Sequence, residues 1–233
     1  MRQDHIKKRG VRSLQLGAGI AAAVLLAGGL WVFATGWHPS PASFPFQGVD
    51  VSAEQGSIEW PVLRAGGAQF AYITATMGAS GRDPRFEAHW HDVYEAGMGR
   101  GAIHRYSLCT LAIDQANNFN ATVPRESDAL PAAIDLQFAP DCPSRPDRKI
   151  VVGELQQLIA LVETHTGQPA ILRVSRDFEA AYKVSEALRR PLWSVQNFFP
   201  PDYAARPWRL WQATDMRRMD GATMPLHWDV VAP

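Results

Sequence analysis

Short apolar runs alternate with segments of helical periodicity over most of this 233-residue chain, and this alternation limits the possible folds more than any other feature. Runs rich in β-branched and aromatic residues predict strands, at 47–52, 68–76, 99–107, 130–138, 168–175, 190–196, 209–214 and 225–231. Helical segments are predicted at 57–67, 83–98, 112–123, 149–167 and 176–188. Strands that alternate with helices over short connections favour a parallel sheet with right-handed crossovers. Because the last strands are short and lack full helices between them, we expect an α/β fold with a closed or nearly closed TIM-like (β/α) barrel.

An uncharged segment near the N-terminus predicts a membrane span. Between Ser13 and Val49 there is no Asp, Glu, Lys or Arg. Residues 14–37, LQLGAGIAAAVLLAGGLWVFATGW, are long enough as a helix to cross a hydrocarbon core ~30 Å thick. Trp31 and Trp37 lie towards the far end of this segment, where amphipathic rings favour the membrane interface. A cleaved signal peptide is the alternative, but the apolar run is longer than the apolar region of most such peptides.

The charges that precede the apolar segment set its expected orientation. Five basic residues and one acid lie within residues 1–13, so the positive-inside rule places that end in the cytoplasm. We therefore expect a basic cytoplasmic segment at 1–13, a transmembrane helix at 14–37, a Pro-rich linker at 38–45 and a folded barrel at 46–233. This organisation predicts a single-pass protein of the inner (cytoplasmic) membrane, with its barrel in the periplasm or at the cell exterior.

The chain carries no net charge, but the part that follows the basic segment is net acidic. An acidic body argues against nucleic acid as a partner and is compatible with a neutral polymer or glycan. The two cysteines, Cys109 and Cys142, are too few for a zinc cluster, and we expect neither a metal nor a cofactor. Each cysteine follows a predicted strand, so neighbouring strands would bring both to one edge of the sheet. We expect a disulfide in an oxidising compartment, with two unpaired thiols as the alternative.

Polar side chains recur where the predicted strands end. In a β/α barrel the chemistry lies at the C-terminal ends of the strands. The candidates at these positions are Asp50, Thr76, His104, Asp135, Gln137, Trp211, Gln212 and Asp229. Asp135 and Gln137 are two residues apart, so both side chains leave the same face of their strand. The sequence therefore predicts a polar site at the mouth of the barrel.

Six short motifs also occur in an order that characterises a known family. They are GVDVSAEQGSIEW at 48–60, AYITATMG at 71–78, GAIHRYS at 101–107, QANNF at 115–119, LPAAIDLQF at 130–138 and LWQAT at 210–214. The series resembles the glycoside hydrolases of family 25, the Chalaropsis-type lysozymes, from about Gln47 to Trp228. Each motif alone is a weak signal, whereas six in the right order are specific.

The resemblance implies a barrel enzyme that cleaves peptidoglycan glycan strands at the muramic acid–glucosamine linkage. It carries Asp50 and Asp135 onto conserved active-site carboxylates of the family, and Gln137 onto the glutamate that is thought to be the general acid. An amide cannot supply a proton, because its N–H is far too weakly acidic, and it can only donate a hydrogen bond. Loss of a positioned general acid typically lowers the rate by about 10²–10⁴. We therefore expect weak or absent activity.

The remaining candidates receive supporting roles in this interpretation. Asp50 and Asp135 would orient the substrate and stabilise the positive charge that develops on the sugar. The expected substrate-binding residues are Thr76, His104, Trp211, Gln212 and Asp229. Two hypotheses about activity stay open, namely a weakened membrane-anchored muramidase that acts in cell-wall turnover, and a catalytically inactive glycan-binding module that kept the groove.

Other sources of chemistry are less well supported. Glu54, Asp83 or Asp141 could replace the missing acid from a loop, with Glu54 favoured because its loop directly follows Asp50. A Ser–His–Asp hydrolase is disfavoured because no G-x-S-x-G elbow is present. His89 and His91 resemble a metal pair, yet two residues that lie two apart on a helix point in different directions.

Overall fold

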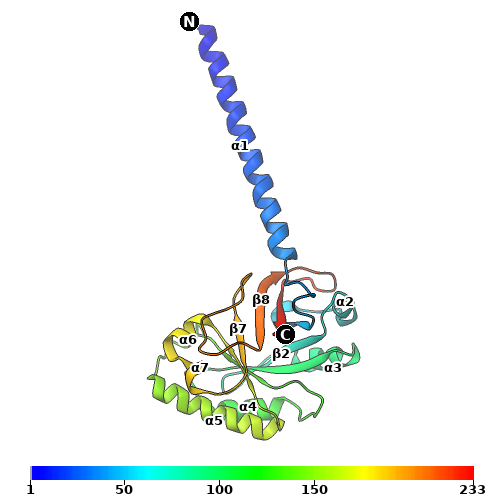
Figure 1. Ribbon diagram of the computed structural model, residues 1–233, viewed down its shortest axis with the longest axis vertical. Helices are drawn as coiled ribbons and strands as arrows, with labels where there is room; N and C mark the ends of the chain where they lie inside the picture. The colour runs from blue at the N-terminus through cyan, green and yellow to red at the C-terminus, as the bar shows by residue number, and fades with distance from the viewer. Residues whose placement is uncertain (1) are drawn as a thin grey trace. The chain divides into compact units, whose positions relative to one another are not determined.

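The computed structural model describes the backbone of residues 2–233 and the side chains from Gly19 onward. The chain consists of two compact units, the first ending at Trp37 and the second spanning His38–Pro233. The first unit consists of helix α1 (Arg2–Gly36), which is drawn in blue in Figure 1. Its Gly19–Gly36 window is long and apolar enough to cross a membrane, judged by length and composition.

The second unit contains a closed barrel of eight strands. They are β1 (Gln47–Val51), β2 (Phe70–Met77), β4 (Gly99–Arg105), β5 (Ala133–Leu136), β6 (Ile171–Val174), β7 (Leu192–Val195), β8 (Leu210–Arg217) and β9 (Leu226–Val231). Their order is β1-β9-β8-β7-β6-β5-β4-β2, and pairing between β1 and β2 closes the ring. The two-residue strand β3 (Gly81–Arg82) forms a hairpin with the end of β2. The α/β barrel predicted from the sequence is confirmed.

The last strand departs from the predicted parallel arrangement. β9 runs antiparallel to both β8 and β1. Residues 218–225 connect β8 to β9, and a parallel connection needs a crossover of a dozen or more residues. The chain therefore reverses in a hairpin, which places His227 at the start of β9 directly opposite Asp50 at the end of β1.

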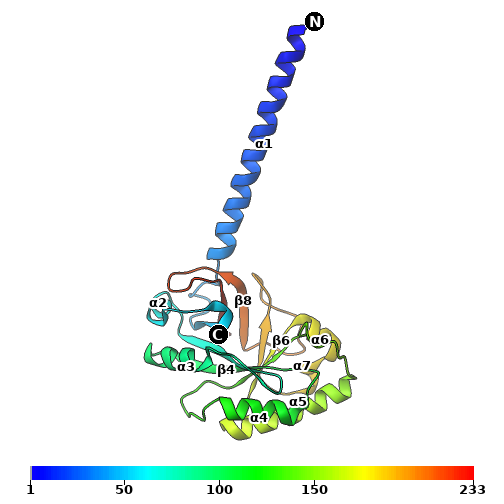
Figure 2. The ribbon, with the colours of Figure 1, turned by 180° about the vertical axis from the view of Figure 1, so that it is seen from behind.

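Helices cover the outside of the barrel (Figures 1 and 2). They are α2 (Trp60–Ala65), α3 (Phe86–Glu95), α4 (Ala112–Thr122), α5 (Arg148–Thr166), α6 (Arg176–Tyr182) and α7 (Val184–Ala187), with a 3-10 turn η1 (Ala53–Gln55) after β1. α4 and α5 lie side by side in both views. One face of α5, which includes Leu155, Leu158 and Val162, is fully buried. The helix ends at Gly167, whose φ of 73° is the left-handed conformation that favours glycine after a helix.

The barrel interior changes character along its axis. A cluster of buried apolar side chains fills the part near the N-terminal ends of the parallel strands, formed by Phe70, Tyr72, Ile103, Ala133, Ile171, Trp193 and Leu210. Tyr72 from β2 and Trp193 from β7 meet there, with ring centroids 4.9 Å apart. Because this layer is packed with apolar groups, the polar residues of the interior collect at the opposite end, where the parallel strands terminate.

Candidate active site

Charged and polar side chains meet at the C-terminal ends of the parallel strands. They are contributed by five strands that lie far apart in the sequence, as Asp50 on β1, Asp135 on β5, Arg173 on β6, Gln212 on β8 and His227 on β9. Gln137 joins them from the residues that follow β5. The sequence predicted Asp50, Asp135, Gln137 and Gln212 for this mouth, and the structure brings these four together around Arg173 through hydrogen bonds and ion pairs.

The guanidinium of Arg173 links opposite sides of the cluster. Its Nη1 lies 2.7 Å from Oδ1 of Asp135, and its Nη2 lies 3.8 Å from Oδ2 of Asp50. Nη2 also donates a hydrogen bond to Oε1 of Gln212. Arg173 is 7% exposed, and a charge so deeply buried needs ionic partners. Sequence reasoning missed this residue, although a single charge within the apolar run ILRV is a signal that could have found it.

Gln137 binds to Asp135 rather than to a distant group. Its Nε2 donates to Oδ2 of Asp135 over 2.5 Å, while Arg173 occupies the other oxygen of that carboxylate. The amide therefore keeps the position that the resemblance assigns to an acid, and it is only partly buried. Both oxygens of Asp135 are engaged, so this carboxylate is held in one orientation at the mouth.

Asp50 forms a close pair with His227, a residue that sequence reasoning also missed. Nδ1 of His227 lies 2.8 Å from Oδ1 of Asp50. Burial raises the pKa of Asp50, but His227 and then Arg173 outweigh it and lower that pKa to about 2. In return, Asp50 raises the pKa of His227 above its ordinary value, against the opposing effect of burial. The pair therefore favours a carboxylate beside an imidazolium.

Asp229 lies one layer deeper than this pair. The register of β9 sets it opposite Gly48, two residues before Asp50 on β1. It is fully buried, and its Oδ1 accepts a hydrogen bond of 3.0 Å from Nε1 of Trp193. Burial, followed by the Asp50 carboxylate, raises the pKa of Asp229 well above its ordinary value. The sequence predicted a substrate contact for Asp229, whereas its burial leaves it an electrostatic neighbour of Asp50.

Thr76 and His104 lie outside the cluster. Oγ1 of Thr76 and Nδ1 of His104 are 2.8 Å apart, and Nε2 of His104 lies 3.0 Å from Oε1 of Gln115 on α4. Both residues are fully buried, and burial lowers the pKa of His104 to about 4. A bulge between Thr74 and Thr76 shifts the register of β2 against β4, so the inward and outward faces change over at that point. The predicted substrate contact does not match this placement.

Trp211 also faces away from the mouth. It is adjacent to Gln212, and neighbouring residues on a strand point to opposite faces. Gln212 takes the inward face and reaches Arg173, while Trp211 packs between Phe44 and Trp208. The sequence predicted both residues as substrate contacts, and only Gln212 lies in the cluster.

The loop acids considered as replacement donors occupy different settings. Asp83 is buried and accepts hydrogen bonds from the backbone N–H groups of Ala53 and Arg85, so it acts as a structural cap. Glu54 in η1 and Asp141 after β5 are exposed. Among the residues from Gly19 onward, no group of three or more His, Cys, Asp or Glu side chains could hold a metal ion.

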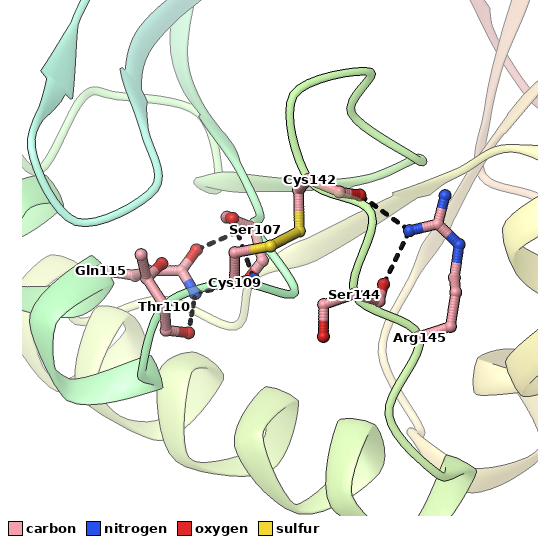
Figure 3. Close-up of a disulfide and its surroundings, with 7 residues drawn as sticks. All are labelled: Ser107, Cys109, Thr110, Gln115, Cys142, Ser144 and Arg145. Atoms are coloured by element: carbon pink, nitrogen blue, oxygen red, sulfur yellow. Dashed lines mark hydrogen bonds between the residues drawn. A yellow bond between two sulfur atoms is a disulfide. The ribbon is translucent and has the colours of Figure 1, made fainter.

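A disulfide joins two loops at this end of the barrel (Figure 3). Cys109, in the loop between β4 and α4, is bonded to Cys142, in the loop between β5 and α5, with Cα atoms 5.9 Å apart. Gln115 organises the first of these loops, because its amide donates to the carbonyl oxygens of Ser107 and Thr110 and accepts from the N–H of Ser107. The pairing matches the expectation from the sequence and excludes two unpaired thiols.

A closed eight-stranded barrel with carboxylates at its strand ends defines the chain as an α/β-barrel protein with an acidic mouth. The chain belongs to family 25 of the glycosyl hydrolases, because the sequence profile described as "Glycosyl hydrolases family 25" matches residues 49–222. The match covers both carboxylates at the mouth and Gln137, but ends before His227.

Individual relatives agree with this assignment. The uncharacterized protein YegX of Escherichia coli is 32% identical over 197 residues, which cover 82% of this chain and 71% of that protein. Lysozyme M1 of Streptomyces globisporus is 38% identical over 98 residues, 40% of this chain and 33% of that protein. The structure of a family 25 glycosyl hydrolase from Bacillus anthracis superposes with a TM-score of 0.76 at 29% identity, covering 84% of this chain and 92% of the other.

Proposed function

We propose that the barrel hydrolyses peptidoglycan glycan strands as a muramidase, at a rate lowered by the amide at position 137. The observation that carries this proposal is the convergence of Asp50, Asp135 and Gln137 at one mouth, joined through Arg173. Two carboxylates on different sides of a barrel mouth are the elements with which glycosidases stabilise an oxocarbenium-like transition state. Membership of family 25 and the similarity to lysozyme M1 support peptidoglycan as the substrate.

The contact between Gln137 and Asp135 explains why the amide matters. A glutamate at position 137 would place an oxygen about where Nε2 now lies, 2.5 Å from Oδ2 of Asp135. Two carboxylates so close cannot both ionise, so one keeps a proton near neutral pH and can serve as a general acid. Glutamine keeps the shape and the hydrogen bond but holds no transferable proton.

A second candidate function is a glycan-binding module without catalysis, and one observation favours it. Arg173 neutralises Asp135 and approaches Asp50, so part of the negative charge that would stabilise a cationic transition state is already compensated. A sugar could still hydrogen-bond to the half-exposed groups at the mouth. The two functions therefore differ in turnover and not in binding.

The test uses the full chain in mild detergent with purified insoluble peptidoglycan. Release of reducing ends reports hydrolysis, and co-sedimentation reports binding. We expect slow release by the wild type and a gain of about 10–10² with Gln137→Glu, part of the range for a general acid. Gln156→Glu is the matched control, because Gln156 is exposed on α5, and it should leave the rate unchanged.

Two results would change the assignment. Binding by the wild type without release at any pH, together with release by Gln137→Glu, would establish the binding module. A chain that neither sediments with peptidoglycan nor releases reducing ends in any variant would remove both functions.

We also propose that α1 is an uncleaved anchor that holds the barrel outside the cytoplasmic membrane. Large apolar side chains along α1 are exposed, among them Leu25 at 76% and Val32 at 69%, and such a surface requires an apolar solvent. The basic residues before it favour a cytoplasmic N-terminus. The intact mass of the protein recovered from membranes tests this proposal, and a mature chain that starts between Trp37 and Gln47 would show a cleaved signal peptide instead.

A further inference from the structure

A partly exposed histidine lies on the side of the mouth opposite Gln137. His227 opens β9, and the antiparallel register sets it directly across from Asp50. Its side chain is 29% exposed, whereas that of Asp50 is only 7% exposed. Among the groups paired with Asp50, His227 is thus the one that reaches solvent at the mouth, since Arg173 is buried.

The hydrogen bond to Asp50 fixes which ring nitrogen is used. Nδ1 lies 2.8 Å from Oδ1 of Asp50, so the carboxylate orients the ring through Nδ1 and leaves Nε2 for a substrate. A carboxylate that holds one nitrogen of a histidine also stabilises the imidazolium form. Position, exposure and orientation are the properties a general acid requires.

We propose that His227 delivers the proton that Gln137 cannot, acting as the general acid for glycosidic cleavage with Asp50 as its positioning residue. This inference rests on the proposed function, because it names the donor for that same reaction. It assigns the role of proton donor to His227 on β9, a strand on which the sequence predicted no general acid.

The proton balance of the step closes with groups present at the mouth and water. The proton on Nε2 passes to the glycosidic oxygen as the bond between that oxygen and the anomeric carbon breaks, and the electron pair of the bond stays with the oxygen. Water adds to the anomeric carbon and loses its proton to a carboxylate, for which Asp135 is placed across the mouth. That proton returns through solvent to Nε2, which restores the imidazolium.

The surroundings of His227 favour its charged form relative to an ordinary histidine. Three charged groups act on it, each from a different strand, as Asp50 on β1, Arg173 on β6 and Asp215 on β8. The two acids raise the pKa of His227, Asp50 more than Asp215, while burial and Arg173 lower it. The net direction is upward, so the donor remains protonated at a higher pH than an ordinary histidine.

The test measures reducing-end release from insoluble peptidoglycan by the full chain in detergent, across pH 5–9. His227→Gln should lower kcat by about 10²–10⁴ and change KM little, because glutamine can still hydrogen-bond to Asp50. The wild-type rate should fall as pH rises through the pKa of His227. His91→Gln, which changes an exposed histidine on α3, should match the wild type.

A double variant separates a lost donor from a damaged site. Adding Gln137→Glu to His227→Gln supplies an acid on the other side of the mouth, so we expect activity to return. A structural defect at position 227 would not be repaired in this way.

The outcomes distinguish the role of His227 as general acid from the muramidase activity of the barrel. If the wild type releases reducing ends and His227→Gln does so equally well, with the same pH profile, the inference fails and the hydrolase stands. If the wild type is silent at every pH while Gln137→Glu is active, both fail, because the imidazolium then delivers no proton.

Discussion

The two sides of the barrel mouth differ in the form in which they could hold a proton. On the β5 side, Asp135 accepts hydrogen bonds from Gln137 and Arg173, and neither donor can release a proton near neutral pH. On the β1–β9 side, Asp50 holds His227, whose pKa is raised. The family resemblance placed the acid on the β5 side, whereas this chain carries its titratable donor on the other. A general acid can thus be absent from the strand where the family carries it, while a proton donor is present on the other side of Arg173.

The largest expected effect comes from removing the connection between the sides. Arg173→Met leaves the buried carboxylates of Asp135 and Asp50 without their shared cation. Loss of one partner from a buried ionic network costs about 3–5 kcal/mol, so the free energy of unfolding in urea should fall by about that amount. Arg189→Met is the control, since Arg189 is exposed and surface changes stay within about 0.5 kcal/mol. A loss below about 1 kcal/mol would show that the two sides are stabilised independently of Arg173.

The stability of the β5 side of the mouth should depend on the disulfide more than that of the β1–β9 side does. Cys109 and Cys142 are 33 residues apart in sequence and tie together the loops that follow β4 and β5. Closing a loop of that length stabilises a fold by about 2–4 kcal/mol, and the double change Cys109→Ser and Cys142→Ser should lower the unfolding free energy accordingly. Treating the wild type with a reductant should produce the same loss without changing any side chain. If neither treatment alters stability, the packing of α4 on α5 alone holds these loops.

The sequence was sufficient for the barrel and for most of the acidic positions at its mouth. Short apolar strands, buried along most of their length, recur at short intervals, and strand ends in such a barrel gather at one edge, so Asp50, Asp135 and Gln137 could be assigned together. The fold follows from local periodicity, which a single sequence displays directly.

The face of the barrel that each side chain takes, and the partner that it contacts, were less predictable because both depend on strand register. The bulge in β2 turned Thr76 away from the mouth, and no local signal marks a bulge within AYITATM. Its partner His104 faces outward because it follows the inward-facing Ile103 on β4. The hairpin that reverses β9 decided that His227 meets Asp50. Arg173 was visible as a charge in an apolar strand, but its partners lie on β1, β5 and β8, and only the closed barrel brings them together.

The smallest expected effect is the most specific to the β1–β9 side. Because the folded-state pKa of His227 lies above its ordinary value of 6.5, the ionic pair with Asp50 contributes stability that is fully present below about pH 6.5 and is lost as pH rises through the folded pKa. Asp50, with a pKa of about 2, stays ionised over this range. Exposure of His227 screens part of the interaction, so the stability difference between wild type and His227→Gln should shrink by about 1 kcal/mol between pH 6 and pH 9.

Urea unfolding of both proteins at several pH values measures this difference directly, and His91→Gln supplies the matched histidine control. A difference that stays constant from pH 6 to pH 9 would mean that folding does not raise the pKa of His227. The pairing with Asp50 would then give no stabilisation of the imidazolium, and His227 would lose the property that marks it out as the donor near neutral pH.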